Sequence, residues 1–166
     1  MNKHPLRVIL SDLRSSGNVG SILRTADAAG VELVYACGYT PYPRLPRDDR
    51  PPHVARTNTR AIAKTALGAE ATIPIVHYAN ALAAIDHARL DGFSIIVLEQ
   101  AEKSLNLYQY QPSSPIALVA GNEVTGVLAP ELAAADRILE LPMIGAKESL
   151  NVSVATAIAL YHLRFG

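Results

Sequence analysis

The amino-acid sequence predicts an α/β fold, with a mostly parallel sheet covered by helices on both faces. Strand-like apolar runs alternate along the chain with segments of helical periodicity, in a β-α-β order. Three glycine-containing polar loops each follow a predicted strand. Open α/β sheets bind their ligands at such strand ends. The length of 166 residues and the composition, 49% hydrophobic and 18% charged, fit one compact domain.

Six strands and five helices follow from these patterns. The strands are expected at Arg7–Ser11, Leu33–Ala36, Ile73–His77, Ser94–Leu98, Ile116–Ala120 and Arg137–Leu141. The helices are expected at Val19–Ala29, Asn58–Leu67, Ala79–Arg89, Ala129–Ala134 and Asn151–Leu163. The segment from Gly38 to His53 holds five of the chain's 11 prolines and is expected to be a surface excursion of the same domain.

Composition excludes several classes of protein. The apolar run from Val152 to Tyr161 is too short to cross a bilayer, and the first residues lack the apolar core of a signal peptide, so we expect a soluble, cytoplasmic protein. Cys37 is the single cysteine, which excludes an intramolecular disulfide. The five histidines are scattered without metal-ligand spacing, and no metal is expected.

The net charge of zero hides an uneven distribution. Residues 1–64 hold ten Lys and Arg against five Asp and Glu, whereas the remainder holds five against ten. A Pro-rich part of this basic half also contains Tyr39, Tyr42 and His53, a combination that suits phosphate contact and base stacking. A solvated loop and helix face explains the same pattern equally well. The basic residues of this part are Arg44, Arg47, Arg50, Arg56, Arg60 and Lys64.

The first glycine-containing loop leads from a strand into a helix. The residues from Ser15 to Asn18 have the character of a turn and an N-cap. Ile22, Ala26 and Ala29 then lie on a core-facing stripe. Arg24 lies on a different face. It is either a surface arginine that pairs with Asp27 or a guanidinium that holds a phosphate or hydroxyl group of a ligand.

The second and third loops lie late in the chain. Gly121 and Gly126 allow close backbone approach to a ligand, and Glu123 supplies a carboxylate, unless it only caps the next helix. Ser149 and Asn151 offer polar groups, or simply form the N-cap region of the last helix. The nucleophile-elbow, phosphate-loop and dinucleotide-binding motifs are absent, which disfavours hydrolases, nucleotidases and dehydrogenases. We expect the three loops to form one small-ligand site.

Taken in order, the three loops resemble the motifs of the SpoU (TrmH-like) family of RNA ribose 2′-O-methyltransferases, in the SPOUT class of S-adenosylmethionine enzymes. The first motif is Asn18–Ala26, N-x-G-S-x-x-R-T-A. The second is Gly121–Val127, G-N-E-x-x-G-V, and the third is Leu141–Ala155, L-P-M-x-G-x-x-x-S-L-N-V-S-V-A. Leu141 stands where isoleucine is common, a volume-conserving exchange. The resemblance covers nearly the whole chain.

This resemblance implies a deep trefoil knot, formed when the C-terminal segment threads through a loop, which is a rare exception to unknotted topology. S-adenosylmethionine is expected to bind in the knot. Members work as homodimers, so we expect packing through the helices Val152–Phe165 and Val19–Ala29, with the arginine of one subunit meeting the cofactor of the other. The expected cofactor-binding residues are Ala120, Gly121, Asn122, Leu141, Met143, Ile144, Ser149 and Leu150.

The implied reaction is an in-line attack of a ribose 2′-oxygen on the sulfonium methyl group, without a metal. Arg24 is implied to activate the hydroxyl, with Asn18, Glu123, Ser149 and Asn151 placing the reacting groups. Two roles for Arg24 stay open. A guanidinium has a pKa above about 12, so accepting the proton requires an uphill neutral state, whereas a charged Arg24 binds the phosphate and stabilises the developing alkoxide.

The RNA target is less determined. RNA contact is expected along Arg44 to Lys64, with Arg7 and Arg14 nearby, and transfer RNA is favoured over ribosomal RNA because a small neutral core suits a small exposed loop. We expect a minimal domain with almost no extension at either end. The nucleotide methylated and any accessory protein stay open. The alternative is a knotted RNA-binding or cofactor-binding protein without catalysis.

Overall fold

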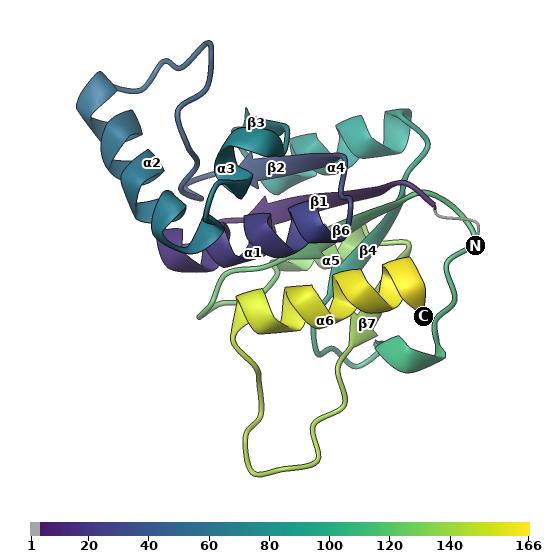
Figure 1. Ribbon diagram of the computed structural model, residues 1–166. Coiled ribbons are helices and arrows are strands. Elements are labelled where there is room, and N and C mark those ends of the chain that lie inside the picture. Colours follow the sequence, from purple (N-terminus) through teal and green to yellow (C-terminus); the bar gives the residue numbers. More distant parts are fainter. Residues whose placement is uncertain (1–3) are drawn as a thin grey trace.

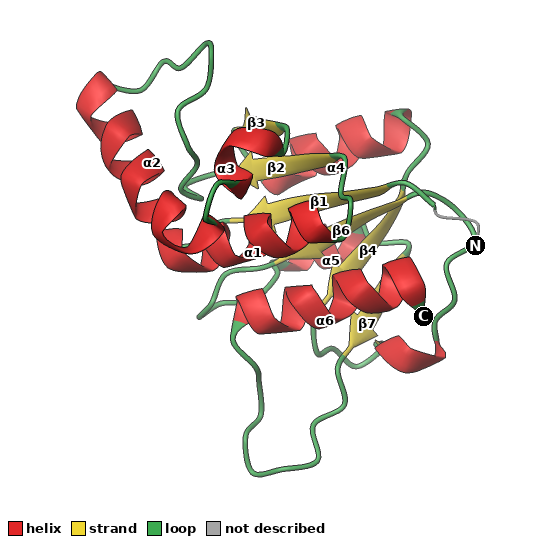
Figure 2. Cartoon of the chain, viewed as in Figure 1, coloured by secondary structure: helices red, strands yellow, loops and turns green. Residues whose placement is uncertain are grey.

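The computed structural model describes residues 4–166, which form a parallel sheet between two layers of helices (Figure 1 and Figure 2). Within these residues the sheet has seven strands in the order β3-β2-β1-β6-β4-β7-β5, and all its pairs are parallel. The strands are β1 Leu6–Ser11, β2 Leu33–Cys37, β3 Ile75–Tyr78, β4 Ser94–Leu98, β5 Leu105–Asn106, β6 Ile116–Ala120 and β7 Arg137–Glu140. The predicted α/β class and parallel sheet are therefore confirmed.

The helices lie close to their predicted positions, with differences at the ends. They are α1 Ser16–Ala28, α2 Pro52–Ala66, α3 Ala69–Thr72, α4 Ala81–Leu90, α5 Ala129–Ala133 and α6 Val152–Phe165, together with the 3₁₀ turn η1 Leu107–Gln109. The sequence prediction started α2 at Asn58. The helix begins at Pro52 instead, because the fixed φ of proline suits the first turn, where an N–H has no helical partner.

Two hydrophobic layers hold the sheet. On one face α1, α2, α3 and α6 pack on the side chains of Leu6, Val8 and Leu10, which alternate along β1. On the other face α4 and α5 cover Ile9 and its neighbours. The predicted core stripe of α1 is confirmed, since Ile22, Ala26 and Ala29 are buried. Because helices cover both faces of the sheet, the sequences of β1, β4 and β6 are nearly continuous apolar runs.

Helix α2 projects from this body beside α1 (Figure 1). A side chain at Gly20 would collide with the carbonyl of Ile62 and with Thr65, so the glycine permits close contact between α1 and α2. The Thr65 hydroxyl also donates to the carbonyl oxygen of Gly17 at 2.9 Å. The basic helix is therefore fixed next to the first motif.

Parallel pairing brings the carboxyl ends of all strands to one edge of the sheet, and Figure 2 shows β1 and β2 pointing toward α2. The three motif loops follow β1, β6 and β7 at this edge. Arg7 lies at the opposite, amino end of β1, where it pairs with Glu32 and Asp91 and stacks over the ring of Phe93. The expectation that Arg7 lies near the segment from Arg44 to Lys64 for RNA contact is not met, because α2 lies at the opposite end of β1. Arg7 instead joins the ends of β1, β2 and α4.

Candidate functional site

The first motif is organised by the start of α1. The hydroxyl of Ser15 accepts from the backbone N–H of Asn18 at 3.2 Å, so the predicted N-cap is confirmed. Asn18 lies half-buried in the first turn, with its side-chain amide directed at the other two motifs. Arg24 is exposed farther along the helix, and the predicted partner Asp27 accepts from Thr72 at 2.9 Å.

The second motif is a tight turn closed by two backbone hydrogen bonds between Asn122 and Gly126, at 3.2 and 3.0 Å. Gly126 has φ +67°, a conformation that suits glycine. The Asn122 side-chain oxygen accepts from the N–H groups of Val124 and Thr125 at 2.7 and 3.0 Å. Its Nδ2 donates to the carbonyl of Asp12 at 2.7 Å and to a tyrosine hydroxyl at 2.9 Å. The Asn122 side chain therefore shapes the loop, with every donor and acceptor position used.

Glu123 joins the second motif to the first. Its carboxylate accepts from the backbone N–H groups of Arg14 and Ser15 at 2.9 and 3.0 Å and from Nδ2 of Asn18 at 2.9 Å. It thus caps α1 rather than the helix that follows it in sequence. Partial burial alone would raise the pKa of Glu123, but these N–H donors stabilise the charged form, and the pKa lies below its usual value.

Asn151 completes the connection to the third motif. Its side-chain oxygen accepts from the backbone N–H of Ser153 at 2.9 Å, which makes it the N-cap of α6, as the simpler interpretation expected. Its Nδ2 also donates to Oδ1 of Asn18 at 3.2 Å. Asn18 therefore bridges Glu123 and Asn151, and one hydrogen-bond chain joins segments more than 100 residues apart in sequence.

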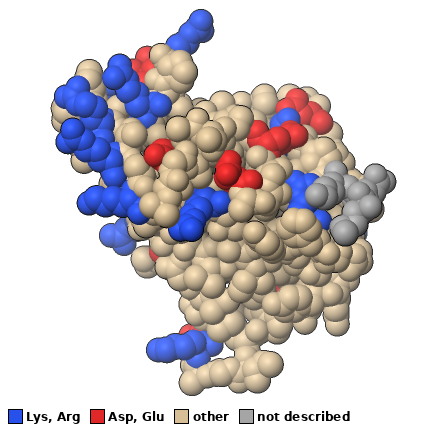
Figure 3. All heavy atoms as spheres, viewed as in Figure 1, with Lys and Arg blue, Asp and Glu red and all other residues tan. Residues whose placement is uncertain are grey.

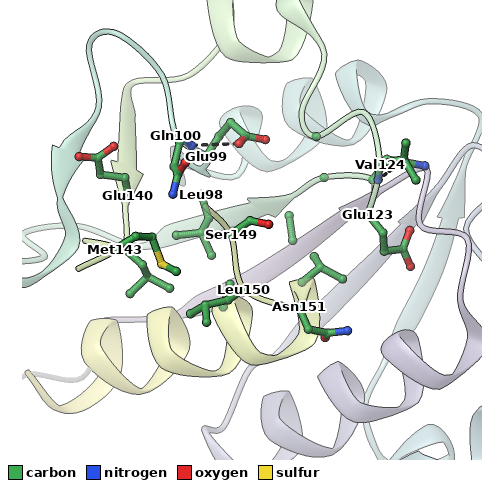
Figure 4. Close-up of a pocket in the computed structure, with 17 residues that line it drawn as sticks. Leu98, Glu99, Gln100, Glu123, Val124, Glu140, Met143, Ser149, Leu150 and Asn151 are labelled. Atoms are coloured by element: carbon green, nitrogen blue, oxygen red, sulfur yellow. Dashed lines mark hydrogen bonds between the residues drawn. The ribbon is translucent and has the colours of Figure 1, made fainter. Parts of the chain in front are cut away.

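A pocket of about 480 Å³ lies at the carboxyl ends of β4, β6 and β7, beside the start of α6 (Figure 4). This volume falls within the usual range for small-ligand sites. It is lined by Leu98, Glu99, Gln100, Ala120, Gly121, Asn122, Glu123, Val124, Gly126, Glu140, Leu141, Met143, Ser149, Leu150, Asn151, Val152 and Ala155.

Most of the predicted cofactor residues line this pocket. Those that do are Ala120, Gly121, Asn122, Leu141, Met143, Ser149 and Leu150. Ile144 does not contribute to the wall: its side chain is 99% exposed, because the loop after Met143 turns away from the sheet. Of the predicted catalytic residues, Glu123, Ser149 and Asn151 line the pocket and Asn18 is bonded to its rim. Arg24 stands outside the lining formed by the described residues of its own chain.

The sequence prediction missed the residues that β4 and β7 contribute. Glu99 follows β4 and accepts from the N–H of Val127 at 2.9 Å, while Nε2 of Gln100 donates to the carbonyl of Glu148 at 2.8 Å. Glu140, at the end of β7, accepts from the hydroxyl of Ser104 at 2.6 Å. Their position directly at predicted strand ends was the available signal.

The pocket is acidic, which restricts what it can bind. Three glutamates, Glu99, Glu123 and Glu140, are among the lining residues, and the lining holds no Lys, Arg or His among the described residues. A Cβ atom at Gly121 would lie 2.6 Å from the backbone of both Gly126 and Val127. The strand end therefore has room for a backbone but not for a side chain. A small ligand of positive charge fits this arrangement.

Basic side chains gather over α2 and the loop before it, at the same end of the molecule (Figure 3). The exposed residues of this surface, named here the α2 basic surface, are Arg44, Arg47, Arg56, Arg60 and Lys64. Arg56, Arg60 and Lys64 follow one another at intervals of four, so they share one face of α2. Arg14 is exposed at the end of β1.

Arg50, expected among the RNA contacts, has a structural role instead. Its guanidinium donates to the Asp48 carboxylate at 2.6 Å and to two backbone carbonyls, and it stacks 3.4 Å from the centre of the Tyr42 ring. Hydrogen bonds from Arg50 hold the pKa of Asp48 well below its usual range. These contacts order the Pro-rich loop.

No group of three or more His, Cys, Asp or Glu side chains within residues 4–166 is placed to hold a metal ion. No described helix is long and apolar enough to span a bilayer.

Comparison with known proteins identifies the family. The model of the SpoU rRNA Methylase family matches residues 50–161. The chain is 33% identical over 157 residues to the 23S rRNA (guanosine-2′-O-)-methyltransferase RlmB of Vibrio vulnificus, covering 95% of this chain and 58% of the relative. It is 31% identical over 159 residues to the tRNA (guanosine(18)-2′-O)-methyltransferase of Borreliella burgdorferi, covering 95% and 65%. The chain thus spans less than two thirds of the length of these relatives.

A solved structure gives the same result. The AdoMet-bound rRNA methyltransferase from Sinorhizobium meliloti superposes with a TM-score of 0.78 at 29% identity, covering 97% of this chain and 56% of that one. The matched family model, the relatives and this structure agree with the three motifs at the pocket. The chain belongs to the SpoU methylase family.

Proposed function

We propose that the protein is an S-adenosylmethionine-dependent RNA methyltransferase that acts on a ribose 2′-hydroxyl. The observation that carries this proposal is the pocket with its hydrogen-bonded rim. Residues of the second and third motifs line the cavity, and Asn18 of the first motif is bonded to both Glu123 and Asn151. The names of the relatives and of the solved structure support the same activity.

The pocket fits the proposed cofactor. Its volume and its mixed apolar and polar lining suit an adenosine and a methionine part, and its three carboxylates suit a ligand that carries a sulfonium and an ammonium charge. When bound, S-adenosylmethionine supplies an electrophilic methyl group on a positively charged sulfur. The walls that would hold it are the backbone at Gly121 and the side chains of Leu141, Met143 and Leu150.

The rim residues would place the acceptor. Asn18 is fixed from both sides, so its position relative to the pocket is set before RNA arrives, which lowers the entropic cost of alignment. The N–H donors around Glu123 keep its side chain in the carboxylate form, so its positioning role requires no change of protonation state. Ser149 directs a hydroxyl at the cavity from the third motif (Figure 4).

We also infer that the active unit is a homodimer in which Arg24 of one protomer reaches the pocket of its partner. Arg24 is exposed and lies outside its own chain's pocket. The surface of α6 carries a stripe that includes Val154, Tyr161 and Phe165, each about half exposed, at spacings that put them on one helix face. A second copy of the chain packed against α6 would bury these side chains.

A mixed-dimer experiment tests this arrangement. Arg24→Ala leaves the pocket intact, and Gly121→Ala damages the pocket but leaves the arginine. Each variant alone is expected to be inactive, whereas an equimolar mixture refolded together should regain about a quarter of the wild-type activity, because half of the dimers then hold one complete site. An active Arg24→Ala homodimer, or a mixture without recovery, would contradict the proposal.

The α2 basic surface is proposed to hold the RNA. Its side chains are exposed and lie at the pocket's end of the molecule, where phosphates can be contacted beside the reacting ribose. Removing Arg56, Arg60 and Lys64 together should weaken RNA binding and lower the salt dependence by about 2–3 in log–log slope. Replacing Lys103 and Arg137, which lie elsewhere, serves as the control. Relatives act on both tRNA and rRNA, and we retain tRNA as the first substrate to test.

Two expectations from the sequence analysis stay predictions. One is the trefoil knot, for which the bond between Gln100 and the Glu148 carbonyl offers support, because it joins the segment after β4 to the segment before α6. The other is a cytoplasmic location.

The activity itself is tested by incubating the purified protein with labelled S-adenosylmethionine and total RNA, then mapping the methylated nucleotide. We expect a 2′-O-methyl group at one position, and no transfer when that position carries a 2′-deoxyribose. Label on a base rather than on a ribose would contradict the assignment. Cofactor and RNA binding without any transfer would favour the non-catalytic alternative.

A further inference from the structure

Tyr39 combines exposure with rigid anchoring. Its side chain is 63% exposed, although it belongs to the turn that directly follows β2 at the carboxyl edge of the sheet. Its backbone N–H donates to the Asp12 carboxylate at 3.1 Å, and its hydroxyl accepts from Nδ2 of Asn122 at 2.9 Å. An aromatic ring with a fixed backbone and a fixed tip therefore presents its faces to solvent.

The residues on either side strengthen this anchoring. The hydroxyl of Thr40 is buried, donates to the carbonyl of Leu10 at 3.0 Å and accepts from the N–H of Leu13 at 3.0 Å. The N–H of Gly38 donates to the carbonyl of Tyr78 at 3.0 Å. The ring is therefore held in place while most of its surface stays exposed.

The other aromatic residue of this loop is not free for a ligand. One face of Tyr42 stacks on the ring of His77, with 4.6 Å between centroids and 19° between planes. The other face is covered by the guanidinium of Arg50. Of the two tyrosines in this segment, Tyr39 therefore keeps the capacity for base stacking that the sequence predicts.

Tyr39 also lies between the two parts of the proposed RNA-binding site. Its hydroxyl contacts the residue next to Glu123, and the same Asn122 side chain holds the N–H of Val124, which is 73% exposed and lines the pocket. In the other direction along the chain, Tyr39 leads into the loop that bears Arg44 and Arg47 of the α2 basic surface. An RNA strand that runs from the α2 basic surface to the pocket would pass the ring of Tyr39.

We propose that Tyr39 is a stacking platform that binds an unpaired base of the RNA substrate and so positions the nearby ribose at the pocket. This rests on the proposed function for the identity of the polymer. Its physical basis is that every base has a π-face that stacks on an aromatic ring, whereas bases inside a duplex are already stacked and unavailable. Asn122 acts as the positioning residue that holds the ring.

The chain has no tryptophan, which allows a direct test. Tyr39→Trp places a sole tryptophan at the platform, and Tyr108→Trp places one in η1, where the tyrosine is 54% exposed, as a matched control. The fluorescence of each variant is titrated with a 12-nucleotide oligoadenylate and with a 12-base-pair RNA duplex at low salt. Stacking predicts quenching of the residue-39 signal by the single strand only.

Three results would overturn the proposal: no quenching at position 39, equal quenching at position 108, or quenching by the duplex as strong as that by the single strand. The titration needs neither cofactor nor turnover. It therefore tests base stacking at Tyr39 independently of the proposed methyl transfer. A failure of the proposed methyl transfer would instead appear as RNA without label.

Substitution of the ring gives the second test, with bulk tRNA as the probe. Tyr39→Leu should raise the Kd for tRNA about 5- to 150-fold, the measured range for one stacked base. Tyr39→Phe keeps the ring and should stay within about threefold of wild type. Both variants lose the hydroxyl that accepts from Asn122, so their melting temperatures should fall by a similar small amount. S-adenosylmethionine binding should be unchanged in both. Equal losses of tRNA affinity for Leu and Phe, or a loss of cofactor affinity, would show a structural role and contradict stacking.

Discussion

Replacing Glu123 by glutamine tests the contact that joins the first two motifs. The carboxylate accepts three N–H donors, from Arg14, Ser15 and Asn18. A glutamine keeps one oxygen, but its NH₂ group must then face an N–H donor, so at least one hydrogen bond is lost. It also removes the negative charge at the start of α1, where the helix dipole favours an anion.

The magnitude follows from these losses. A hydrogen bond to a charged group contributes about 1.5–3 kcal/mol, and a charge at a helix terminus about 0.3–1 kcal/mol. Because Glu123 is partly exposed, solvent screens both contributions, and we expect a loss of about 2 kcal/mol in the free energy of unfolding. For a chain of this size that corresponds to a melting temperature lower by about 4–8 °C.

Calorimetry from pH 7 down to pH 3 provides the assay and adds a signature. The folded-state pKa of Glu123 is lowered, so its stabilising contribution is complete above the unfolded value of about 4.3 and is lost as the pH falls through the folded value. The difference between wild type and Glu123→Gln should therefore shrink on acidification. The same exchange at the exposed Glu102 is the control. Equal effects at both sites, or a difference that grows at low pH, would refute the reasoning.

Three further outcomes are expected. Gly121→Ala should weaken S-adenosylmethionine binding at least about tenfold by calorimetry, because the new Cβ atom collides with the backbone of Val127; unchanged affinity would place the cofactor elsewhere. Cys37 is fully buried, and burial, with nearby acidic groups, raises its pKa to about 12, so iodoacetamide at pH 8 should label it only after unfolding; fast native labelling would contradict this. Arg164→Ala removes donors to three backbone carbonyls, including that of Gly30, and should lower the free energy of unfolding by about 2–4 kcal/mol; an unaltered melting temperature would show that these bonds contribute nothing.

The large elements of the fold could be predicted because their hydrophobic patterns are local. The apolar runs of β1, β4 and β6 and the periodicity of α1 and α6 identify them without any tertiary information. The short elements could not be found in this way. α3 has four residues and β5 has two, too few for a period to repeat, and β5 exists only because Leu105 pairs with Leu139 of β7.

The site was predictable where a motif carried it and not where distant contacts did. Gly121, Ser149 and Asn151 were found from their loops. Glu99 and Glu140 enter the pocket only because β4 lies between β6 and β7, a strand order that the sequence does not state.

The two arginines with structural roles illustrate the same limit. Arg50 and Arg7 read as free cations in sequence, yet each has carboxylate and aromatic partners, and Arg7 acquires its partners from other elements of the fold. Local sequence reports the charge of a side chain, whereas packing decides whether that charge remains available. The α2 basic surface keeps its charges because its helix face is turned to solvent.

A crystal structure of the protein grown with S-adenosylmethionine tests the central claim most directly. The account predicts cofactor density in the pocket between the ends of β4, β6 and β7, in contact with Gly121, Met143 and Leu150, with the bonds from Asn18 to Glu123 and Asn151 retained. Cofactor bound at another place would contradict it. So would a complex in which Asn18, Glu123 and Asn151 lie apart from one another.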